Sequence, residues 1–490
     1  MKMLSVFVLS LVGLSSAEVG QFGLPSPWSY TCDSSNTSHL VTGHVVPNIC
    51  RKVPSSQATR VQSLQACKMT CDPAGLVWPA PRGHLELSHD LLHFLPDDMR
   101  VTSVISPSEA VSNMVNEFSE NVFREYLYMM SPDYQGGFKN PFSESPFIRG
   151  GSVQMSIKVE DEDLSLTTET DESYQLTIQR TGVGKDSVIV LITAQTYYGA
   201  RHALETLSQM IGYDDFSDTL IIYAEAKVED SPSFKHRGVL LDTSRNFMTT
   251  EVIKKVIRGM SYDKLNVFHW HITDTHSFPF YSRRVPQLTL HGAYSARQVY
   301  TPQDIRDIVQ YAKLRGVRVL PEFDAPAHVG NGWQFGEAEG KGRLAVCVNQ
   351  EPWQEYCVEP PCGQINPVNE NVYEVLGKLY QDFMELFETD MFHMGGDEVN
   401  LNCWNTTKEI KEHLVKEGKS DSKEELLGLW ETFQNKAADK VYDAAGKKLP
   451  LILWTNSLTE EVRSDVLRKK IFFNNFCRVM LKSISQMRTM

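Results

Sequence analysis

Two adjacent carboxylates, Asp397 and Glu398, could carry out acid–base chemistry at one site. They follow Gly395 and Gly396, which close an apolar stretch over residues 383–392. Neighbouring residues in a regular strand point to opposite faces, so both carboxylates reach one site only if the chain turns there. Glycines permit such a turn and let a ligand approach the backbone. A solvated acidic turn is the alternative, and apolar side chains after the pair argue against it: Val399, Leu401 and Trp404.

Arg245 is a second candidate, because it ends another apolar run and has Asp242 three residues before it. The two side chains could form a structural ion pair. Alternatively, the planar guanidinium could donate in a fork to vicinal hydroxyl groups of a ligand. Both interpretations stay open on these residues alone.

His269 and His271 lie two residues apart in an apolar run, which places both imidazoles on one face of a strand. A metal-dependent hydrolase would use such a pair, with further ligands from Asp274, His328 and His393. Histidines between the strands of a barrel are also typical of hydrogen-bonded scaffolding. The chain lacks a close pair of carboxylates and histidines at helical spacing, so we expect no metal and no other cofactor.

Aromatic side chains near the ends of several apolar runs favour a sugar ligand, because flat rings can stack on pyranose faces. Any one of these tryptophans is more typical of a core than of a binding platform. Trp454, at the end of an apolar run, is the best single candidate. The tryptophans in question are Trp270, Trp333, Trp353, Trp404 and Trp454.

The order of elements after residue 231 indicates how these groups come together. Apolar strand patterns alternate with helical ones, which predicts parallel strands. Thr249 or Thr250 caps one predicted helix, and a Thr-Pro-Gln-Asp sequence at residues 301–304 starts another. We expect the inward residues of the first helix to be Val252, Ile253, Val256, Ile257 and Met260. The predicted strands lie at residues 238–241, 265–272, 316–320, 390–394 and 449–454.

Polar residues follow four successive predicted strands at their carboxyl ends. This is where (β/α)8 barrels, or TIM barrels, place their active sites. A doubly wound sheet would gather its ligand groups at one crevice and often carries a glycine-rich phosphate turn, which is lacking here. We therefore predict an α/β fold with a catalytic TIM barrel over residues 231–457, preceded by an α+β domain with an antiparallel sheet over residues 76–230.

The ends of the chain predict a secreted protein. Residues 1–17 combine Lys2, an apolar core and small residues typical of a signal-peptide cleavage site. Residues 18–75 are expected to form a cysteine-containing extension. Eight of the nine cysteines fall into two groups that can pair internally, without a fixed connectivity. Asn36 and Asn405 begin N-glycosylation sequences.

The net charge of −13 argues against nucleic acid and against an anionic membrane surface as partners. No stretch after the leader approaches the length of a transmembrane helix. Carboxylates and aromatic rings at the predicted strand ends suit a neutral sugar better.

Several of these segments together resemble glycoside hydrolase family 20, the β-N-acetylhexosaminidases. The resemblance covers roughly residues 75–457. It is carried by RGVLLDTSR at residues 237–245, NVFHWH at 266–271, PEFDAPAH at 321–328 and HMGGDEV at 393–399. The segment CVEPPCGQ at residues 357–364 is similar to the secreted chitooligosaccharide-degrading enzymes of arthropods.

The resemblance implies a retaining mechanism in which the substrate's own 2-acetamido oxygen attacks the anomeric carbon and forms an oxazolinium ion. Glu398 would protonate the leaving oxygen and then act as base on water. Asp397 would hold the acetamido N–H. The other implied roles are sugar binding by Arg245, support of the catalytic pair by Asp274 and His328, an acetamido wall formed by Trp454, and contacts toward the outer sugar from Val358 and Glu359.

The chain departs from the family pattern after Trp454. Family members continue with strands that carry further pocket residues, whereas residues 458–490 are basic and polar and contain the unpaired Cys477. We expect a C-terminally incomplete barrel with a divergent tail, and hence lower stability and weaker catalysis than in a complete relative.

Three functions are therefore expected, in this order. The first is an exo-β-N-acetylhexosaminidase acting on terminal N-acetylglucosamine or N-acetylgalactosamine of oligosaccharides or glycans. The second is a catalytically weak or inactive sugar-binding relative, and the third is a metal hydrolase. The resemblance also favours a homodimer, and a lysosomal location is the alternative to secretion. The natural substrate, whether chitin fragments, N-glycans or glycolipids, stays open.

Overall fold

The computed structural model describes residues 26–33, 39–41, 44–46, 48–71, 76–130, 151–181 and 186–461. Its chain divides into two compact units, one of residues 1–165 and 170–233 and one of residues 166–169 and 234–490. The predicted leader at residues 1–17, the Asn36 glycosylation sequence, Cys477 and most of the predicted tail lie outside the described residues. Among the described residues, no helix has the length and apolar character needed to cross a membrane.

The first unit begins with small antiparallel ribbons linked to a helix by two disulfides, Cys32–Cys71 and Cys50–Cys67. These pairings lie within the N-terminal group of cysteines, as predicted. The elements are β1 (Trp28–Asp33) paired with β4 (Ile49–Pro54), β2 (His39–Val41) paired with β3 (His44–Val46), and α1 (Leu64–Cys71).

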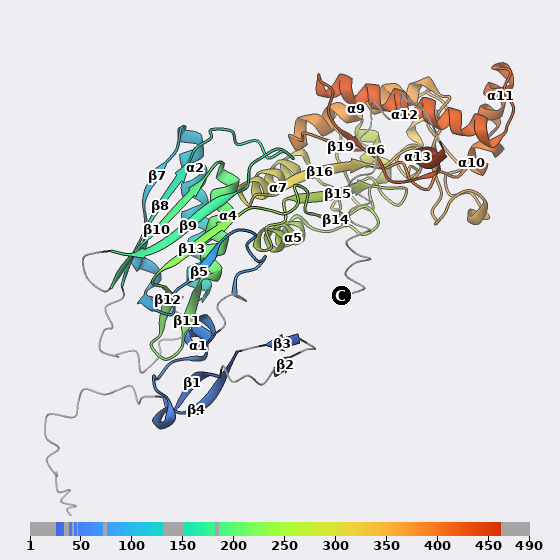
Figure 1. The fold of residues 1–490 in the computed structure, drawn as a ribbon. Helices are drawn as coiled ribbons and strands as arrows, with labels where there is room; N and C mark the ends of the chain where they lie inside the picture. The colour runs from blue at the N-terminus through green and yellow to red at the C-terminus, as the bar shows by residue number, and fades with distance from the viewer. Residues whose placement is uncertain are drawn as a thin grey trace, which may run out of the picture. The chain divides into compact units, whose positions relative to one another are not determined.

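A six-stranded sheet forms the body of the first unit (Figure 1). Its order is β5 (Leu85–Leu87), β13 (Ala226–Asp230), β9 (Tyr174–Arg180), β10 (Ser187–Ala194), β8 (Ser152–Val159) and β7 (Met99–Ile105). The prediction of an antiparallel sheet needs correction, because β8 runs parallel to both β7 and β10. Helical segments between β7 and β8 allow such a parallel connection, which a tight hairpin cannot make.

Helices and a second, three-stranded sheet complete this unit. The sheet order is β11 (Ile211–Asp214), β12 (Thr219–Tyr223) and β6 (Leu91–Phe94), and the helices are α2 (Glu109–Phe118), α3 (Arg124–Met130) and α4 (Tyr197–Gln209). Burial alternates along β8 and β10, as expected of strands that bury one face.

The second unit contains a parallel sheet of five strands among the residues described (Figure 1). Their order follows the sequence: β14 (Gly238–Asp242), β15 (Val267–Thr273), β16 (Arg318–Phe323), β19 (Phe392–His393) and β20 (Leu451–Ile452). All five predicted strands are present, although the last two are shorter than their apolar runs. Strands that neighbour each other in sequence order are typical of a barrel wall.

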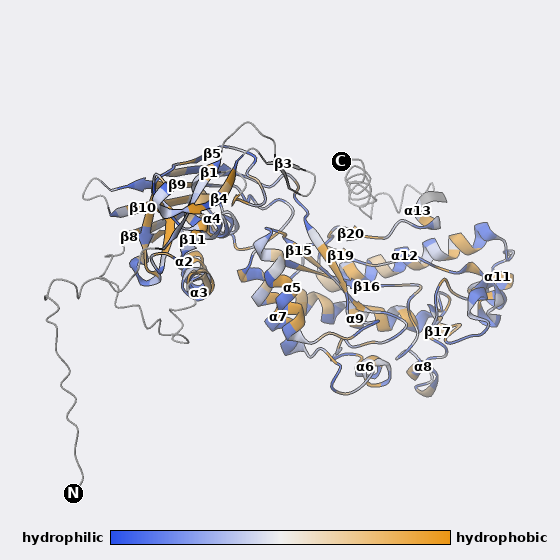
Figure 2. Cartoon of the chain, turned by 90° about the horizontal axis from the view of Figure 1, so that it is seen from below, coloured by the Kyte–Doolittle hydropathy of each residue, from blue (hydrophilic) through white to orange (hydrophobic). Residues whose placement is uncertain are grey.

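Helices follow these strands and pack on one another. Helix α7 contacts α5 and α9, and α9 contacts α12. Figure 2 shows that these helices carry apolar residues among polar ones, as expected of helices that bury one side. The helices are α5 (Thr250–Tyr262), α6 (Pro286–Gly292), α7 (Pro302–Leu314), α8 (Phe335–Ala338), α9 (Glu370–Phe387), α10 (Leu401–Thr406), α11 (Lys408–Lys416), α12 (Lys423–Ala445) and α13 (Ser457–Glu461).

The predicted helix starts are correct in both tested cases. Thr249 is the N-cap of α5, and Thr301 forms a capping box with Asp304 at the start of α7. The prediction that Val252 faces the core is wrong, because its side chain is 40% exposed. A helix that buries Ile253, Ile257 and Met260 turns the preceding position outward, since residues one apart point about 100° away from each other.

Candidate active site

Asp397 and Glu398 leave the strand through a left-handed turn, as the two glycines predict. The φ angles of Gly395, Gly396 and Glu398 are 63°, 82° and 54°. A Cβ atom at Gly395 would lie 1.9 Å from Asp324 Oδ1, so only glycine fits. Asp324 Oδ1 in turn accepts the Gly396 N–H at 2.8 Å. The buried Asp324 carboxyl group therefore holds this turn in place, and the sequence did not predict this role.

Both candidate carboxylates face His328. Its Nε2 atom lies 3.4 Å from Asp397 Oδ1 and 3.3 Å from Glu398 Oε2. Its Nδ1 atom lies 3.3 Å from Oδ2 of the buried Asp274. Asp397 and Glu398 have side chains 31% and 37% exposed, whereas Asp274 is only 1% exposed. A buried carboxylate thus supports an imidazole, which in turn contacts two carboxylates open to solvent.

The charges around His328 determine its protonation. Burial lowers the pKa of His328, but the Asp324 charge and hydrogen bonds with Asp274, Asp397 and Glu398 raise this pKa well above its usual range. Burial likewise opposes ionisation of Asp274, yet hydrogen bonds with His271, His276 and His328 hold its pKa well below its usual range. The central imidazole is therefore an imidazolium, paired with a carboxylate on its buried side.

Arg245 forms the ion pair with Asp242 that was one interpretation of the sequence, and its role toward a sugar stays a prediction. Its Nη1 atom donates to Asp242 Oδ2 at 2.6 Å and lies 3.2 Å from Asp274 Oδ2. Its Nε and Nη2 atoms donate to Glu359 Oε1 at 3.1 and 2.7 Å. The guanidinium is 29% exposed. Arg245 thus links the buried Asp274 to the exposed Glu359.

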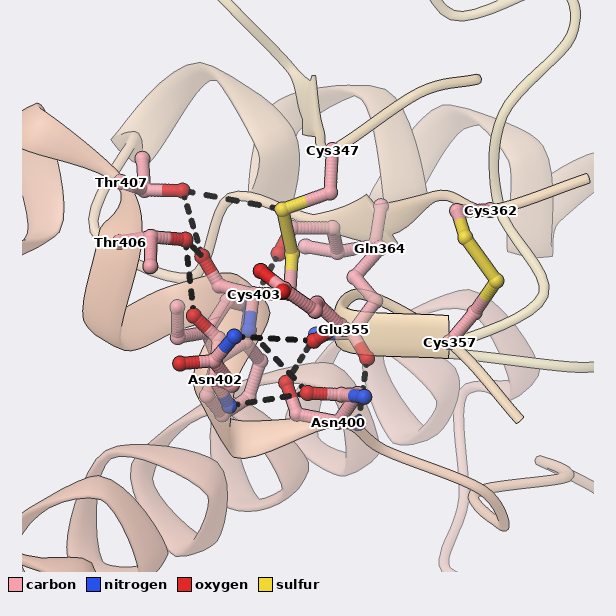
Figure 3. The surroundings of a disulfide bond; sticks show 12 residues. Cys347, Glu355, Cys357, Cys362, Gln364, Asn400, Asn402, Cys403, Thr406 and Thr407 are labelled. Atoms are coloured by element: carbon pink, nitrogen blue, oxygen red, sulfur yellow. Dashed lines mark hydrogen bonds between the residues drawn. A yellow bond between two sulfur atoms is a disulfide. The ribbon is translucent and has the colours of Figure 1, made fainter. Parts of the chain in front are cut away.

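Glu359 and Val358 lie on a loop that two disulfides restrain. Cys357–Cys362 closes the loop itself, and Cys347–Cys403 ties its base to α10 (Figure 3). Gln364 strengthens this tie, because its amide bonds both the N–H and the carbonyl of Asn400. Val358 is exposed. These pairings lie within the second group of cysteines, and the sequence did not specify which partners would pair.

Three of the five candidate tryptophans lie in the hydrophobic core, and one lies next to the acidic pair. Trp270, Trp333 and Trp404 are buried in the hydrophobic core of the second unit. Trp353 begins a short 3-10 turn, Trp353–Glu355, and is partly exposed. Trp454 is also partly exposed and follows β20, and its backbone N–H donates to the Gly395 carbonyl at 2.9 Å. Of the five, only Trp454 is tied directly to the turn that carries the acidic pair, among the contacts of the described residues.

The histidines proposed as alternative metal ligands contact carboxylates instead. Both ring nitrogens of His271 face carboxylate oxygens, with Nε2 3.1 Å from Asp274 and Nδ1 3.1 Å from Glu322. Burial lowers the pKa of His271, but the charge of Glu322 and the bonds to Asp274 and Glu322 raise it well above its usual range. A doubly protonated imidazole offers no lone pair to a metal.

Close spacing disfavours a metal between His269 and Glu322. His269 Nε2 and Glu322 Oε2 are 2.6 Å apart. Two ligands of a tetrahedral zinc ion at about 2.1 Å would stand roughly 3.4 Å apart. The 2.6 Å distance is that of a hydrogen bond, which His269 Nε2 donates to Glu322. For His269 and His271, the geometry supports the scaffolding interpretation.

Comparison with known proteins agrees with this geometry. Residues 234–481 match the catalytic domain of glycosyl hydrolase family 20, and residues 77–210 match a domain described as beta-acetyl hexosaminidase like. The chain belongs to glycosyl hydrolase family 20. It is thus a glycoside hydrolase of the β-N-acetylhexosaminidase class. The catalytic match continues to residue 481, beyond the boundary at residue 457 that was predicted for the barrel.

Two insect relatives are similar over most of the chain. A chitooligosaccharidolytic β-N-acetylglucosaminidase of Bombyx mori is 40% identical over 463 residues, covering 93% of this chain and 71% of the relative. The corresponding protein of Ostrinia furnacalis is 41% identical, covering 88% of this chain and 68% of the relative. This likeness supports the arthropod resemblance inferred from residues 357–364.

Solved family 20 structures share the fold. A chitobiase from Flavobacterium johnsoniae aligns with a TM-score of 0.59 at 24% identity, covering 81% of this chain. An exo-β-N-acetylglucosaminidase from Vibrio harveyi with bound N-acetylglucosamine gives 0.57 at 22% identity and covers 88%. This chain spans 58% and 65% of those two chains. The fold is therefore a (β/α)8 barrel type preceded by an α/β domain.

Proposed function

We propose that this chain removes terminal, non-reducing N-acetylglucosamine or N-acetylgalactosamine residues by a retaining, substrate-assisted reaction. The observation that carries the proposal is the pair Asp397 and Glu398, both solvent-accessible and both at His328. Asp397 Oδ1 is buried, and its contact with His328 Nε2 is long at 3.4 Å, so this oxygen keeps a lone pair for a ligand. A buried acceptor of this kind suits a ligand N–H.

In the proposed first step, Glu398 gives its proton to the glycosidic oxygen while the acetamido oxygen bonds to C1 and the C1–O bond breaks. The product is an oxazolinium ion. Asp397 Oδ1 accepts a hydrogen bond from the N–H of this ion. In the second step, water attacks C1, the C1–O bond to the acetamido group breaks, and Glu398 takes up the water proton. Two displacements at C1 retain its configuration, and neither carboxylate becomes a nucleophile.

The surrounding residues receive supporting roles in this proposal. The imidazolium of His328, held by Asp274, keeps both carboxylates on one side of the sugar. Arg245 binds sugar hydroxyls, and Trp454 walls the acetamido group. Val358 and Glu359 contact the next sugar along the chain. The restrained loop that carries these last two residues supports an outer binding position.

Hydrolysis of a chromogenic N-acetyl-β-glucosaminide tests the proposal in wild type and Glu398→Gln, each with and without a chelator. Loss of a positioned general acid lowers kcat by about 10²–10⁴-fold, so the variant should lose activity and the chelator should change nothing. Glu385→Gln is the matched control, because Glu385 is an exposed carboxylate on α9 that pairs with Arg284. Activity lost with the chelator would point to a metal hydrolase. Sugar binding without any wild-type turnover would point to the inactive relative.

The substrate class follows from the two insect relatives and stays part of the proposal. Their names describe cleavage of chitooligosaccharides, so we propose short β-linked N-acetylglucosamine oligomers as substrates. Comparing kcat/KM for chitotriose with that for a glycan bearing terminal N-acetylglucosamine tests this choice. A preference for the glycan would contradict it.

The compartment and assembly also stay proposals. Four disulfides support an oxidising environment, hence secretion or a compartment that the secretory route feeds. A homodimer is expected from the family resemblance. Light scattering of the purified chain would measure its mass directly, and a monomer would refute the dimer.

A further inference from the structure

Glu322 is a buried carboxylate that the proposed reaction leaves unused. Strand register places it beside His271 of β15 and His393 of β19. His269 lies two residues before His271 and therefore on the same face of β15. The Glu322 side chain is completely buried. Three imidazoles from two neighbouring strands thus surround one carboxylate.

Each oxygen of Glu322 meets two nitrogens. Oε2 lies 2.6 Å from His269 Nε2 and 3.1 Å from His271 Nδ1. Oε1 accepts the indole N–H of Trp454 at 2.7 Å and lies 3.1 Å from His393 Nδ1. A buried carboxylate is costly unless it is paired and hydrogen-bonded, and this one has both kinds of partner.

The protonation of Glu322 makes it an acceptor only. Burial raises its pKa, but the charges of His393, His271 and His269 hold the pKa of Glu322 well below its usual range. An ionised carboxylate has lone pairs but no proton to donate. The Trp454 indole N–H donates to Oε1 at 2.7 Å, and this bond fixes the rotation of the ring.

The same histidines also pack against the Trp454 ring. Its centroid lies 5.6 Å from that of His269, with planes 27° apart, and 4.7 Å from that of His393. The backbone N–H of Trp454 bonds the Gly395 carbonyl, which places the main chain but gives the rotation of the ring no restraint. The Glu322 carboxylate and the two rings it binds supply that restraint.

We propose that Glu322 is a positioning residue that fixes the Trp454 ring and thereby sets the size of acyl group that the enzyme accepts on the sugar nitrogen. This inference rests on the proposed function, in which Trp454 walls the acetamido pocket. A fixed wall excludes an acyl chain longer by one methylene, whereas a mobile wall admits it. Glu322 touches no reacting atom and acts through the indole.

Glu322→Gln tests the inference with little change of shape. The glutamine amide has one oxygen that accepts and one nitrogen that donates. Either the nitrogens of His269 and His271 or those of Trp454 and His393 therefore lose their acceptor. Calorimetry would compare the binding of N-acetylglucosamine and N-propionylglucosamine. One methylene is worth about tenfold or more in a tight pocket, and we expect the variant to lower the wild-type preference to within about threefold.

Asp382→Asn is the matched control. Asp382 is also a buried carboxylate of the second unit, on α9, and accepts bonds from Ser282 and the Arg284 backbone N–H. Its loss should leave the acetyl preference at the wild-type value. Equal weakening of both sugars by Glu322→Gln would overturn the inference, because a merely structural role gives that result.

Trp454→Phe provides a second route if Glu322→Gln does not fold. It keeps an aromatic ring but removes the indole N–H, so the acetyl preference should fall as it does in Glu322→Gln. An unchanged preference would overturn the inference. Where both variants fold, the double variant should lose no more preference than either single variant, and additive losses would overturn the inference.

Binding and turnover separate this inference from the proposed function. A wild-type chain that prefers the acetyl sugar but hydrolyses nothing refutes the proposed reaction, and loss of that preference in Glu322→Gln still supports the role of Glu322. A wild-type chain that turns over substrate, with a preference unaffected by Glu322→Gln, refutes the inference alone. A wild-type chain that binds neither sugar overturns both.

Discussion

Each unit of the protein contains a buried network of histidine and carboxylate, and only one of the two lies at the candidate site. In the first unit, His202 of α4 pairs with Glu172 at 2.9 Å, and Arg201 pairs with Glu205 at 2.9 Å. In the second unit, Glu322 gathers its three histidines at comparable distances. The same residue types thus satisfy buried charges in both places.

The two networks differ in what they connect to. The four side chains of the first network are at most 5% exposed. The second network continues from His271 through Asp274 and His328 to Asp397 and Glu398, which are 31% and 37% exposed. The perturbed charges of the second network therefore mark a candidate functional site, because they lead to groups that a ligand can reach.

Gly395→Ala should have the largest effect, because it displaces the exposed acidic pair at the end of the second network. The new Cβ would collide with Asp324 Oδ1, and the φ of 63° is unfavourable for alanine. A displacement of the acidic pair by 1 Å can cost about 10²-fold in kcat. Turnover of the chromogenic substrate measures this loss. Gly259→Ala on α5 is the control, since nothing lies within 4 Å of its Cβ, and equal activity of the two variants would contradict the prediction.

Glu172→Gln should show that the first network contributes to stability alone. His202 Nδ1 accepts from Arg201 Nη1, so this imidazole is neutral and donates from Nε2 to Glu172. Replacing the carboxylate with an amide weakens a charge-assisted hydrogen bond, which costs about 1.5–3 kcal/mol. Urea unfolding should reveal this loss of free energy of unfolding. At temperatures where the variant is folded, kcat should equal that of wild type. A lower kcat would show that this network also affects the chemistry.

The alkaline stability of the second unit should depend on His328. The pKa of His328 is raised in the folded state, so its ion pairs contribute fully below the unfolded pKa of about 6.5 and are lost as pH rises through the folded pKa. Between the unfolded and the folded pKa of His328, the free energy of unfolding should fall by up to about 1.4 kcal/mol for each pH unit of increase. Denaturation series at several pH values, with His328→Gln beside wild type, would measure this slope. An identical slope in both proteins would refute the assignment.

The sequence was sufficient for residues whose placement follows from strand order. Arg245, Asp274, His328 and the acidic pair come from loops after different strands, and the carboxyl ends of parallel strands meet at one edge. Their convergence was therefore predictable. The resemblance added the role of each residue, which spacing alone did not supply.

Residues inside strands were harder to predict. Glu322 lies in β16, and Asp324 directly follows the last residue of this strand; the sequence predicted a separate role for neither. The importance of Glu322 depends on its register with His271 and His393, and register between strands far apart in sequence is not visible in a single chain. The parallel pairing of β8 in the first unit was missed for the same reason.

Glu359→Gln should have the smallest effect, because it changes only the exposed outer end of the second network. Glu359 is 52% exposed, and Arg245 keeps Asp242 and Asp274 as partners, so the free energy of unfolding should change by less than about 1 kcal/mol. Loss of one charged contact to the outer sugar should raise KM for a disaccharide by about two- to tenfold. KM for a single sugar on a chromogenic leaving group should stay the same. Glu337→Gln, an exposed carboxylate on α8, is the control. Equal KM changes for both substrates would mean that Glu359 acts by holding Arg245 and makes no contact with an outer sugar.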